Sequence, residues 1–130
     1  MALVKAMEYQ SVFTKDDVIN TFSSMGVSKG FLIISSPICP PCNAYKQALN
    51  QEYLVSPEGY AHRNKFVCVT MPANQPNTPL RGPNGLITTL NVRGVPATFL
   101  VDVNQRSFSP VTIMAYSRDG IRNMVAQYEV

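Results

Sequence analysis

The feature that most constrains the fold is an apolar segment that runs directly into a closely spaced pair of cysteines. Residues 30–35 form a continuous, largely apolar run that is too short for a helix, which predicts a central strand buried on both faces. The motif Cys39-Pro40-Pro41-Cys42 follows, and apolar residues then recur at helical spacing from Ala44 to Leu54. The sequence therefore predicts a buried strand that delivers two cysteines onto the first turn of a helix.

Thiol–disulfide exchange is the chemistry that this placement favours. A helix start offers unpaired backbone N–H groups and the positive end of the peptide dipole, and both stabilise a thiolate over a thiol. The spacing places the second sulfur about one turn away, within reach of a small-ring disulfide. We expect Cys39, exposed at the helix start, to be the attacking thiolate and Cys42 to be the buried resolving thiol.

The two prolines between the cysteines tune this site. With Cys39 as the N-cap, Pro40 and Pro41 occupy the first two helical positions, so only the Cys42 N–H remains as a donor. We therefore expect the helix to lower the pKa of the Cys39 thiol only moderately. A less stabilised thiolate makes the reduced form less favoured, which predicts a more reducing couple.

Size and charge limit the other classes of function. The chain has 130 residues, 45% hydrophobic and 15% charged, which predicts one compact domain over residues 1–130, and we expect a monomer. Its net charge of +3 comes from lysines and arginines scattered along the whole length. Nucleic-acid grooves instead cluster their basic residues, so we expect no nucleic-acid partner.

The N-terminal residues 1–8 carry charges at short intervals and lack the apolar core of a secretory signal. No run approaches the ~20 apolar residues of a membrane helix, so we expect a soluble chain in the cytoplasm without a membrane partner. A chain whose leader had been removed would look the same. The periplasm or another oxidising compartment therefore stays open.

Hydrophobic spacing and turn residues predict the order of the remaining elements. They comprise an edge strand at 3–9, a helix from Thr14 to Gly26, the cysteine-bearing helix ending at the turn 56–59, a strand at 65–71, a loop at 72–85, a short helix at 86–90, strands at 97–102 and 111–116, and a closing helix from Ser117. Early alternation favours parallel pairing, and the late hairpin adds antiparallel strands. The predicted class is α/β, with a central mixed sheet of about five strands flanked by helices on both faces.

With a second motif, Arg93-Gly94-Val95-Pro96-Ala97-Thr98 before the strand at 97–102, this order resembles thioredoxin and its relatives, over nearly the whole chain. The resemblance implies a thioredoxin fold in which Val95 and a cis-Pro96 face the cysteine pair. The chain departs from thioredoxin at Ile33, where thioredoxins bury an aspartate.

Three further positions depart from the thioredoxin pattern. Ser35 and Ile38 stand where thioredoxins carry the tryptophans that flank their motif, and Gln47 replaces a proline. The resemblance therefore points to the thioredoxin-like superfamily rather than to the general cytosolic thioredoxin.

The resemblance and the dithiol together predict a thiol–disulfide oxidoreductase that acts on protein disulfides or dithiols through Cys39 and Cys42. A thiol reductase or oxidase would recharge it, and we expect neither cofactor nor metal. Val95 and Pro96 would pair with an extended substrate segment. An apolar rim of Ile38, Val95 and Leu80 would favour protein substrates.

Other interpretations stay open. One alternative is a purely structural disulfide, and another is a zinc or iron–sulfur site with Cys68 and His62 as further ligands. Cys68 lies in an apolar strand, however, which favours an inert core position. The chain would alternatively be a binding or assembly module that uses the loop 72–85, or a glutathione-dependent enzyme of the glutaredoxin type.

Overall fold

A computed structural model describes residues 7–72 and 78–130 of the chain. Its helices are α1 (Lys15–Ser24), α2 (Pro40–Tyr53), α3 (Pro57–Ala61), α4 (Leu86–Thr89) and α5 (Arg118–Gln127), with 3-10 turns η1 (Arg63–Lys65) and η2 (Pro79–Arg81). Its strands are β1 (Lys29–Ser35), β2 (Phe66–Thr70), β3 (Ala97–Asp102) and β4 (Ser107–Val111). None of the helices within the described ranges has the length and apolar character needed to cross a bilayer.

The four strands form one mixed sheet in the order β2-β1-β3-β4. Strand β1 is central, parallel to β2 and antiparallel to β3, and β4 pairs antiparallel with β3 at the edge. Every β1 residue after Lys29 is buried, as the continuous apolar run predicts for a strand covered on both faces. The predicted α/β architecture with a mixed sheet is confirmed.

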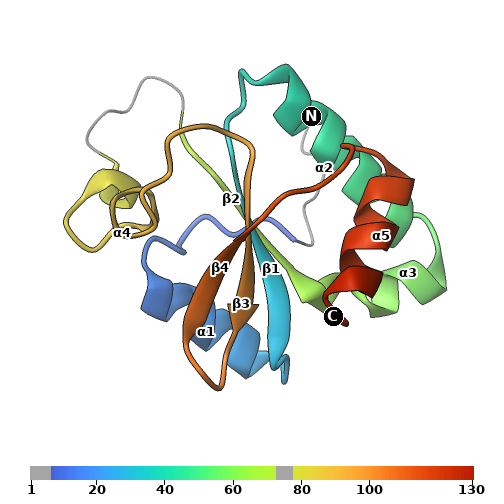
Figure 1. Ribbon diagram of the computed structural model, residues 1–130, viewed down its shortest axis with the longest axis horizontal. Helices are drawn as coiled ribbons and strands as arrows, with labels where there is room; N and C mark the ends of the chain where they lie inside the picture. The colour runs from blue at the N-terminus through green and yellow to red at the C-terminus, as the bar shows by residue number, and fades with distance from the viewer. Residues whose placement is uncertain (1–6, 73–77) are drawn as a thin grey trace.

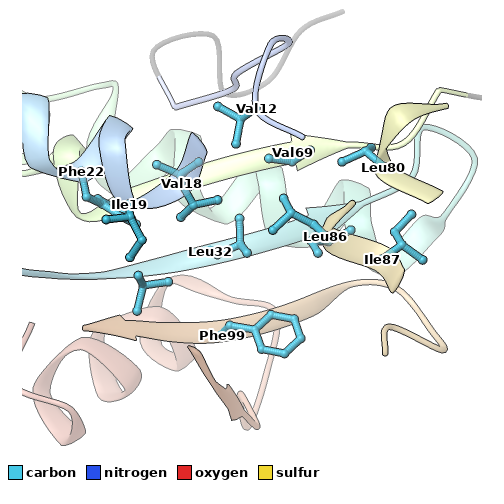
Figure 2. Close-up of a cluster of buried hydrophobic side chains, with 13 residues drawn as sticks. Val12, Val18, Ile19, Phe22, Leu32, Val69, Leu80, Leu86, Ile87 and Phe99 are labelled. Carbon is cyan, nitrogen blue, oxygen red and sulfur yellow. The ribbon is translucent and has the colours of Figure 1, made fainter. Parts of the chain in front are cut away.

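Helices cover both faces of the sheet (Figure 1). On one face, α1 and α4 pack over Leu32 and Ile34 of β1, in a core drawn in Figure 2. On the other face, α2 and α5 pack over Phe31 and Ile33. Successive residues of a strand point to opposite faces, so β1 alone divides its side chains between the two cores.

The first helix begins and ends at the residues that the sequence predicted. Thr14 caps α1: its hydroxyl accepts the Asp17 N–H at 3.1 Å, and the Asp17 carboxylate accepts the Thr14 N–H at 3.1 Å. Gly26 follows the helix with φ of +71°, a left-handed conformation that glycine adopts without steric cost.

The sheet has four strands rather than the five predicted. The fifth was expected at residues 3–9, of which 3–6 lie outside the described residues. Glu8 makes only a single parallel bridge to Cys68, where the Cys68 N–H donates to the Met7 carbonyl and the Tyr9 N–H to the Cys68 carbonyl. Residues 7–9, the described part of this segment, thus lie beside β2 and pair with it through this single bridge.

Two boundaries were also predicted wrongly. The return strand was expected at 111–116, but β4 ends at Val111, because the hairpin turns at residues 103–106 with Arg106 in the left-handed region. Pro110 within β4 obscured the strand, and an edge strand tolerates proline. The expected turn at 56–59 instead starts the short helix α3, where the Ser56 hydroxyl accepts the Gly59 N–H at 3.1 Å.

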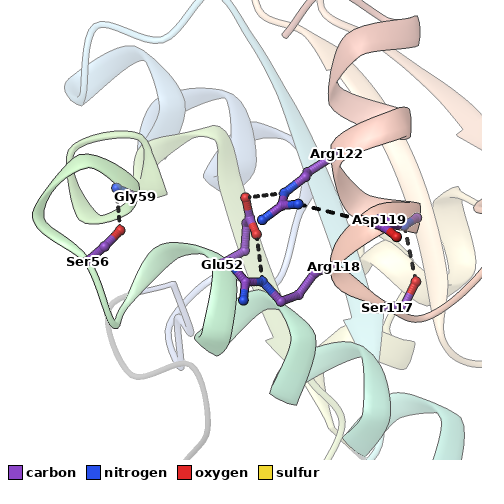
Figure 3. A network of polar contacts seen from close by, with 8 residues as sticks. Glu52, Ser56, Gly59, Ser117, Arg118, Asp119 and Arg122 are labelled. Carbon is purple, nitrogen blue, oxygen red and sulfur yellow. Dashed lines mark hydrogen bonds and ion pairs between the residues drawn. The ribbon is translucent and has the colours of Figure 1, made fainter.

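An ion-pair cluster fixes α2 against α5 (Figure 3). The Glu52 carboxylate accepts hydrogen bonds from Arg122 Nε at 2.8 Å and from Arg118 Nε at 2.9 Å. These bonds, chiefly the one from Arg122, lower the pKa of Glu52. The cluster helps to hold the cysteine-bearing helix in place.

Candidate active site

The cysteine pair sits at the start of α2, immediately beyond the C-terminal end of β1. Cys39 is the N-cap, and its sulfur accepts the Cys42 N–H at 3.2 Å. Pro40 and Pro41 fill the first two helical positions and have no N–H to donate. The predicted placement, with a single backbone donor to the Cys39 sulfur, is confirmed.

Cys39 and Cys42 form a disulfide whose Cα atoms are 5.1 Å apart. Cys39 is half-buried, whereas Cys42 is fully buried against the sheet. This asymmetry gives an incoming disulfide access to one sulfur and holds the other one turn behind it. The geometry is that of a dithiol able to open and close by exchange.

The second predicted motif lies next to the first, at the ends of two adjacent strands. The Val95–Pro96 peptide bond is cis, and the Val95 carbonyl oxygen lies 3.7 Å from Cys39 Sγ. The two segments meet because β3 runs antiparallel to β1 with Ile34 opposite Ala97. The residues just before β3 therefore lie at the same end of the sheet as the C-terminal end of β1.

The apolar rim around the cysteines is smaller than predicted. Ile38 is 80% exposed beside Cys39, and Val95 and Pro96 are half-buried. Leu80 was predicted at the rim, but this was wrong: it is 1% exposed and packs with Val12 and other residues in the core on the α1 side (Figure 2). The turn η2 brings Leu80 inward, a placement that its proline-rich surroundings did not indicate.

The two candidate additional metal ligands lie in different surroundings. Cys68 is a free, fully buried thiol; burial, and to a smaller extent the charge of Glu8, raise its pKa to about 12. His62 is exposed at the end of α3. Within residues 7–72 and 78–130, no three histidine, cysteine or acidic side chains are grouped as a metal site requires.

Sequence reasoning missed a polar cluster beneath the same helix. Lys46, on the buried face of α2, makes an ion pair with Glu8 at 3.0 Å and donates to the Thr70 hydroxyl at 2.7 Å. The Thr70 hydroxyl donates to Glu8 at 3.1 Å and lies 2.9 Å from the Ser35 hydroxyl. The available signal was a lysine four residues after Cys42, on the face that the helical pattern assigns to the core.

A cavity of about 930 Å³ adjoins this cluster. Pro37 and Asn43, which flank the cysteine motif, form part of its wall together with Glu8, Lys46 and Thr70. The cavity therefore lies at the same end of the sheet as the disulfide, and the ion pair of Glu8 and Lys46 forms part of its wall.

Solved structures share this arrangement of sheet, helices and loops. The chain is similar to a thioredoxin from Trichomonas vaginalis, with a TM-score of 0.60, 13% identity, and coverage of 94% of this chain and 96% of that one. It is also similar to a thioredoxin from Thermus thermophilus, with a TM-score of 0.55, 18% identity, and coverage of 100% and 89%. The chain has the thioredoxin fold.

A third similar structure is a complex of ferredoxin:thioredoxin reductase with thioredoxin f2, at a TM-score of 0.57, 15% identity, and coverage of 95% and 94%. No protein-family model matches the sequence, and no curated protein is significantly similar to it. Identities this low establish the thioredoxin fold alone. The function must therefore be argued from the chemistry of the site.

Proposed function

We propose that the protein is a thiol–disulfide oxidoreductase that exchanges electrons with protein disulfides or dithiols through Cys39 and Cys42. The observation that carries the proposal is the disulfide between a half-buried and a fully buried cysteine at the start of α2, with the Val95 carbonyl oxygen 3.7 Å from Cys39 Sγ. Nucleophile, resolving thiol and a backbone acceptor for substrate lie together.

In the reducing direction, the Cys39 thiolate attacks one sulfur of the substrate disulfide, and the other substrate sulfur leaves as a thiolate. Cys42, once deprotonated, attacks Cys39 Sγ in this mixed disulfide. The Cys39–Cys42 bond forms, the bond to substrate breaks, and two electrons have passed to the substrate. The reverse sequence oxidises a dithiol.

Protein substrates fit this surface better than small thiols do. The Val95 carbonyl provides a backbone acceptor next to the sulfur, where an extended segment can pair as a strand does. The exposed Ile38 adds apolar contact on the same side. A partner thiol reductase or oxidase would dock on this same surface to recharge the site, and we propose a cytoplasmic location.

The test is the reduction of insulin disulfides by dithiothreitol, followed as turbidity. We expect the wild type to accelerate reduction and Cys39→Ser to abolish the acceleration. Cys42→Ser should instead stall as a mixed disulfide with its substrate, which mass spectrometry would identify. A wild-type protein that leaves insulin reduction unchanged would refute the proposal, and a partner still bound by Cys39→Ser would indicate a binding module.

A further inference from the structure

The ion pair of Glu8 and Lys46 is largely shielded from solvent. The Lys46 side chain is 8% exposed and that of Glu8 25%, and Lys46 Nζ contacts both the Glu8 carboxylate and the Thr70 hydroxyl. Since the single Thr70 proton points to Glu8, Thr70 accepts hydrogen bonds from Lys46 and from Ser35. The ammonium is thus fixed from two sides.

Lys46 lies one helical turn after the resolving cysteine. Cys42 and Lys46 are both on the buried face of α2, four residues apart, where side chains sit one above the other with Cβ atoms about 5–6 Å apart. Ser35, which completes the cluster, is the last residue of β1 and precedes Cys39 by four positions. The cluster therefore lies beneath the first turns of α2, on the inner side of the disulfide.

Packing alone does not account for a lysine at this position. Desolvating two charges opposes folding, and apolar residues of similar volume often stabilise a buried site as well as an ion pair does. A methionine would fill the same space between α2 and β2. What a methionine lacks is positive charge beside Cys42.

Cys42 needs such a charge when the disulfide is open. Its sulfur is fully buried, and burial disfavours a thiolate because water cannot solvate it. Cys68, fully buried in the core between the sheet and α2, illustrates the effect: burial and Glu8 raise its pKa, and Lys46 lowers it. The fields of both charges therefore extend into this part of the protein.

We propose that Lys46 is a positioning residue for the resolving step: its ammonium, held by Glu8 and Thr70, stabilises the thiolate of Cys42 in the mixed disulfide. The inference rests on the proposed oxidoreductase function. The Cys42 proton is released to solvent. The Cys42 thiolate then forms its bond to Cys39 Sγ, and the substrate sulfur departs with the electron pair.

Several ionisable groups lie on the elements around Cys42. Besides Lys46, they include Cys39 and Tyr45 of α2, Glu8 and Tyr9 of the N-terminal segment, Cys68 of β2, and Tyr116 before α5. Burial raises the pKa of Tyr45 well above that of free tyrosine and that of Cys68 to about 12. The Lys46 and Glu8 variants therefore decide whether a pH transition in the resolving step belongs to Cys42.

The test separates the two thiol steps with the chromogenic disulfide dithiobis(nitrobenzoate) in stopped flow. Attack by Cys39 releases the first coloured thiolate, and attack by Cys42 on the resulting mixed disulfide releases the second. We expect Lys46→Met to slow the second phase about tenfold at neutral pH and to move its pH midpoint upward, since one pKa unit is a tenfold change in thiolate. The first phase should change less than about twofold, and Lys46→Arg should restore the second.

Glu8→Gln distinguishes a charge effect from a structural one. If the cluster only fastens the N-terminal segment to the sheet, Glu8→Gln and Lys46→Met should both slow the second phase. The proposal predicts opposite signs, because Glu8 opposes the thiolate that Lys46 stabilises, so Glu8→Gln should lower the midpoint. If Lys46→Met does not fold, the shift of the midpoint in Glu8→Gln still tests the proposal.

Lys65→Met is the matched control. Lys65 Nζ donates to the Val130 carbonyl at 2.8 Å, just before the start of β2 and at the opposite end of the strand from Thr70. Both phases should be unchanged in this variant. A wild type without a first phase would refute the oxidoreductase function itself, whereas a normal first phase with a second phase indifferent to Lys46→Met and Glu8→Gln would overturn only the role of Lys46.

Discussion

The Cys39 sulfur receives one backbone hydrogen bond, from Cys42 at 3.2 Å, because proline occupies both intervening positions. An N-cap side chain normally accepts from the second or third helical N–H, and Pro41 removes the former. The Pro40 position matters less, since a first-turn N–H at that point does not reach the cap. The residue at 41 should therefore set the stability of the thiolate.

Pro41→Ala restores the missing donor. We expect the pKa of the Cys39 thiol to fall by about 0.5–1, because a hydrogen bond to a charged acceptor is stronger than one to a neutral acceptor, and the couple to become less reducing. Thiolate absorbance against pH measures the first effect, and equilibration with glutathione buffers the second. Pro40→Ala is the control, and an equal fall in pKa for both variants would contradict the cap argument.

At single positions, sequence reasoning succeeded where a backbone rule applied and failed where partners came from distant segments. The N-cap role of Cys39 follows from local order alone. Lys46 is partnered by Glu8 and Thr70, residues 38 positions before it and 24 after it, so no local pattern reveals that its charge is buried and paired. The prediction that Leu80 lies at the rim was wrong for the same reason, because tertiary packing determines its exposure.

Among the elements, strongly patterned segments were predicted well. Strand β3 has the predicted bounds, α2 begins after the predicted cap Cys39, and α5 begins after Ser117, where the closing helix was predicted to start. Elements that were misjudged are short or lie at an edge, where little burial constrains the pattern: β4 is largely half-buried or exposed, and α3 buries no residue. The bridge between Glu8 and Cys68 likewise depends on the position of β2, which the sequence around Glu8 does not indicate.

The contact between α2 and α5 depends on Glu52 (Figure 3). We expect Glu52→Gln to lower the melting temperature by about 2–4 °C at pH 7, a modest loss because both arginine partners are half-exposed. Calorimetry measures this loss. Glu58→Gln, in an exposed position on α3 without an ion pair among the described residues, is the matched control.

The loss should depend on pH with a defined sign. Hydrogen bonds from Arg122 and Arg118 lower the pKa of Glu52 in the folded state, so its contribution is complete above the unfolded value of about 4.3 and fades as pH falls through the lower folded value. Wild type and Glu52→Gln should therefore converge in acid. A difference in melting temperature that persists once Glu52 is protonated would show that Glu52 acts through packing instead.

For the whole molecule, the site exists because the sheet joins two segments that lie far apart in sequence. The pairing of β1 with β3 sets Val95 against Cys39, 56 residues away, while the helices on both faces keep β1 rigid and buried. Both motifs and their boundaries could be recognised in the sequence. The antiparallel pairing of β1 with β3 that brings them together was not predicted, because antiparallel pairing was expected only in the late hairpin. The cavity and the cluster at its wall required three-dimensional structure, since their residues come from the N-terminal segment, α2, β2 and η2.

The surface that this assembly presents to a partner gives the last prediction. Ile38 is 80% exposed next to Cys39, and burying part of it against a protein substrate would contribute about 1 kcal/mol. Ile38→Ser should therefore lower kcat/KM for insulin about fivefold and leave the reaction with dithiobis(nitrobenzoate), which is too small to cover the rim, nearly unchanged. Val55→Ser, at a residue 68% exposed between α2 and α3, should alter neither rate. Equal losses with both substrates would mean that Ile38 acts on the reactivity of Cys39 rather than on recognition of the protein.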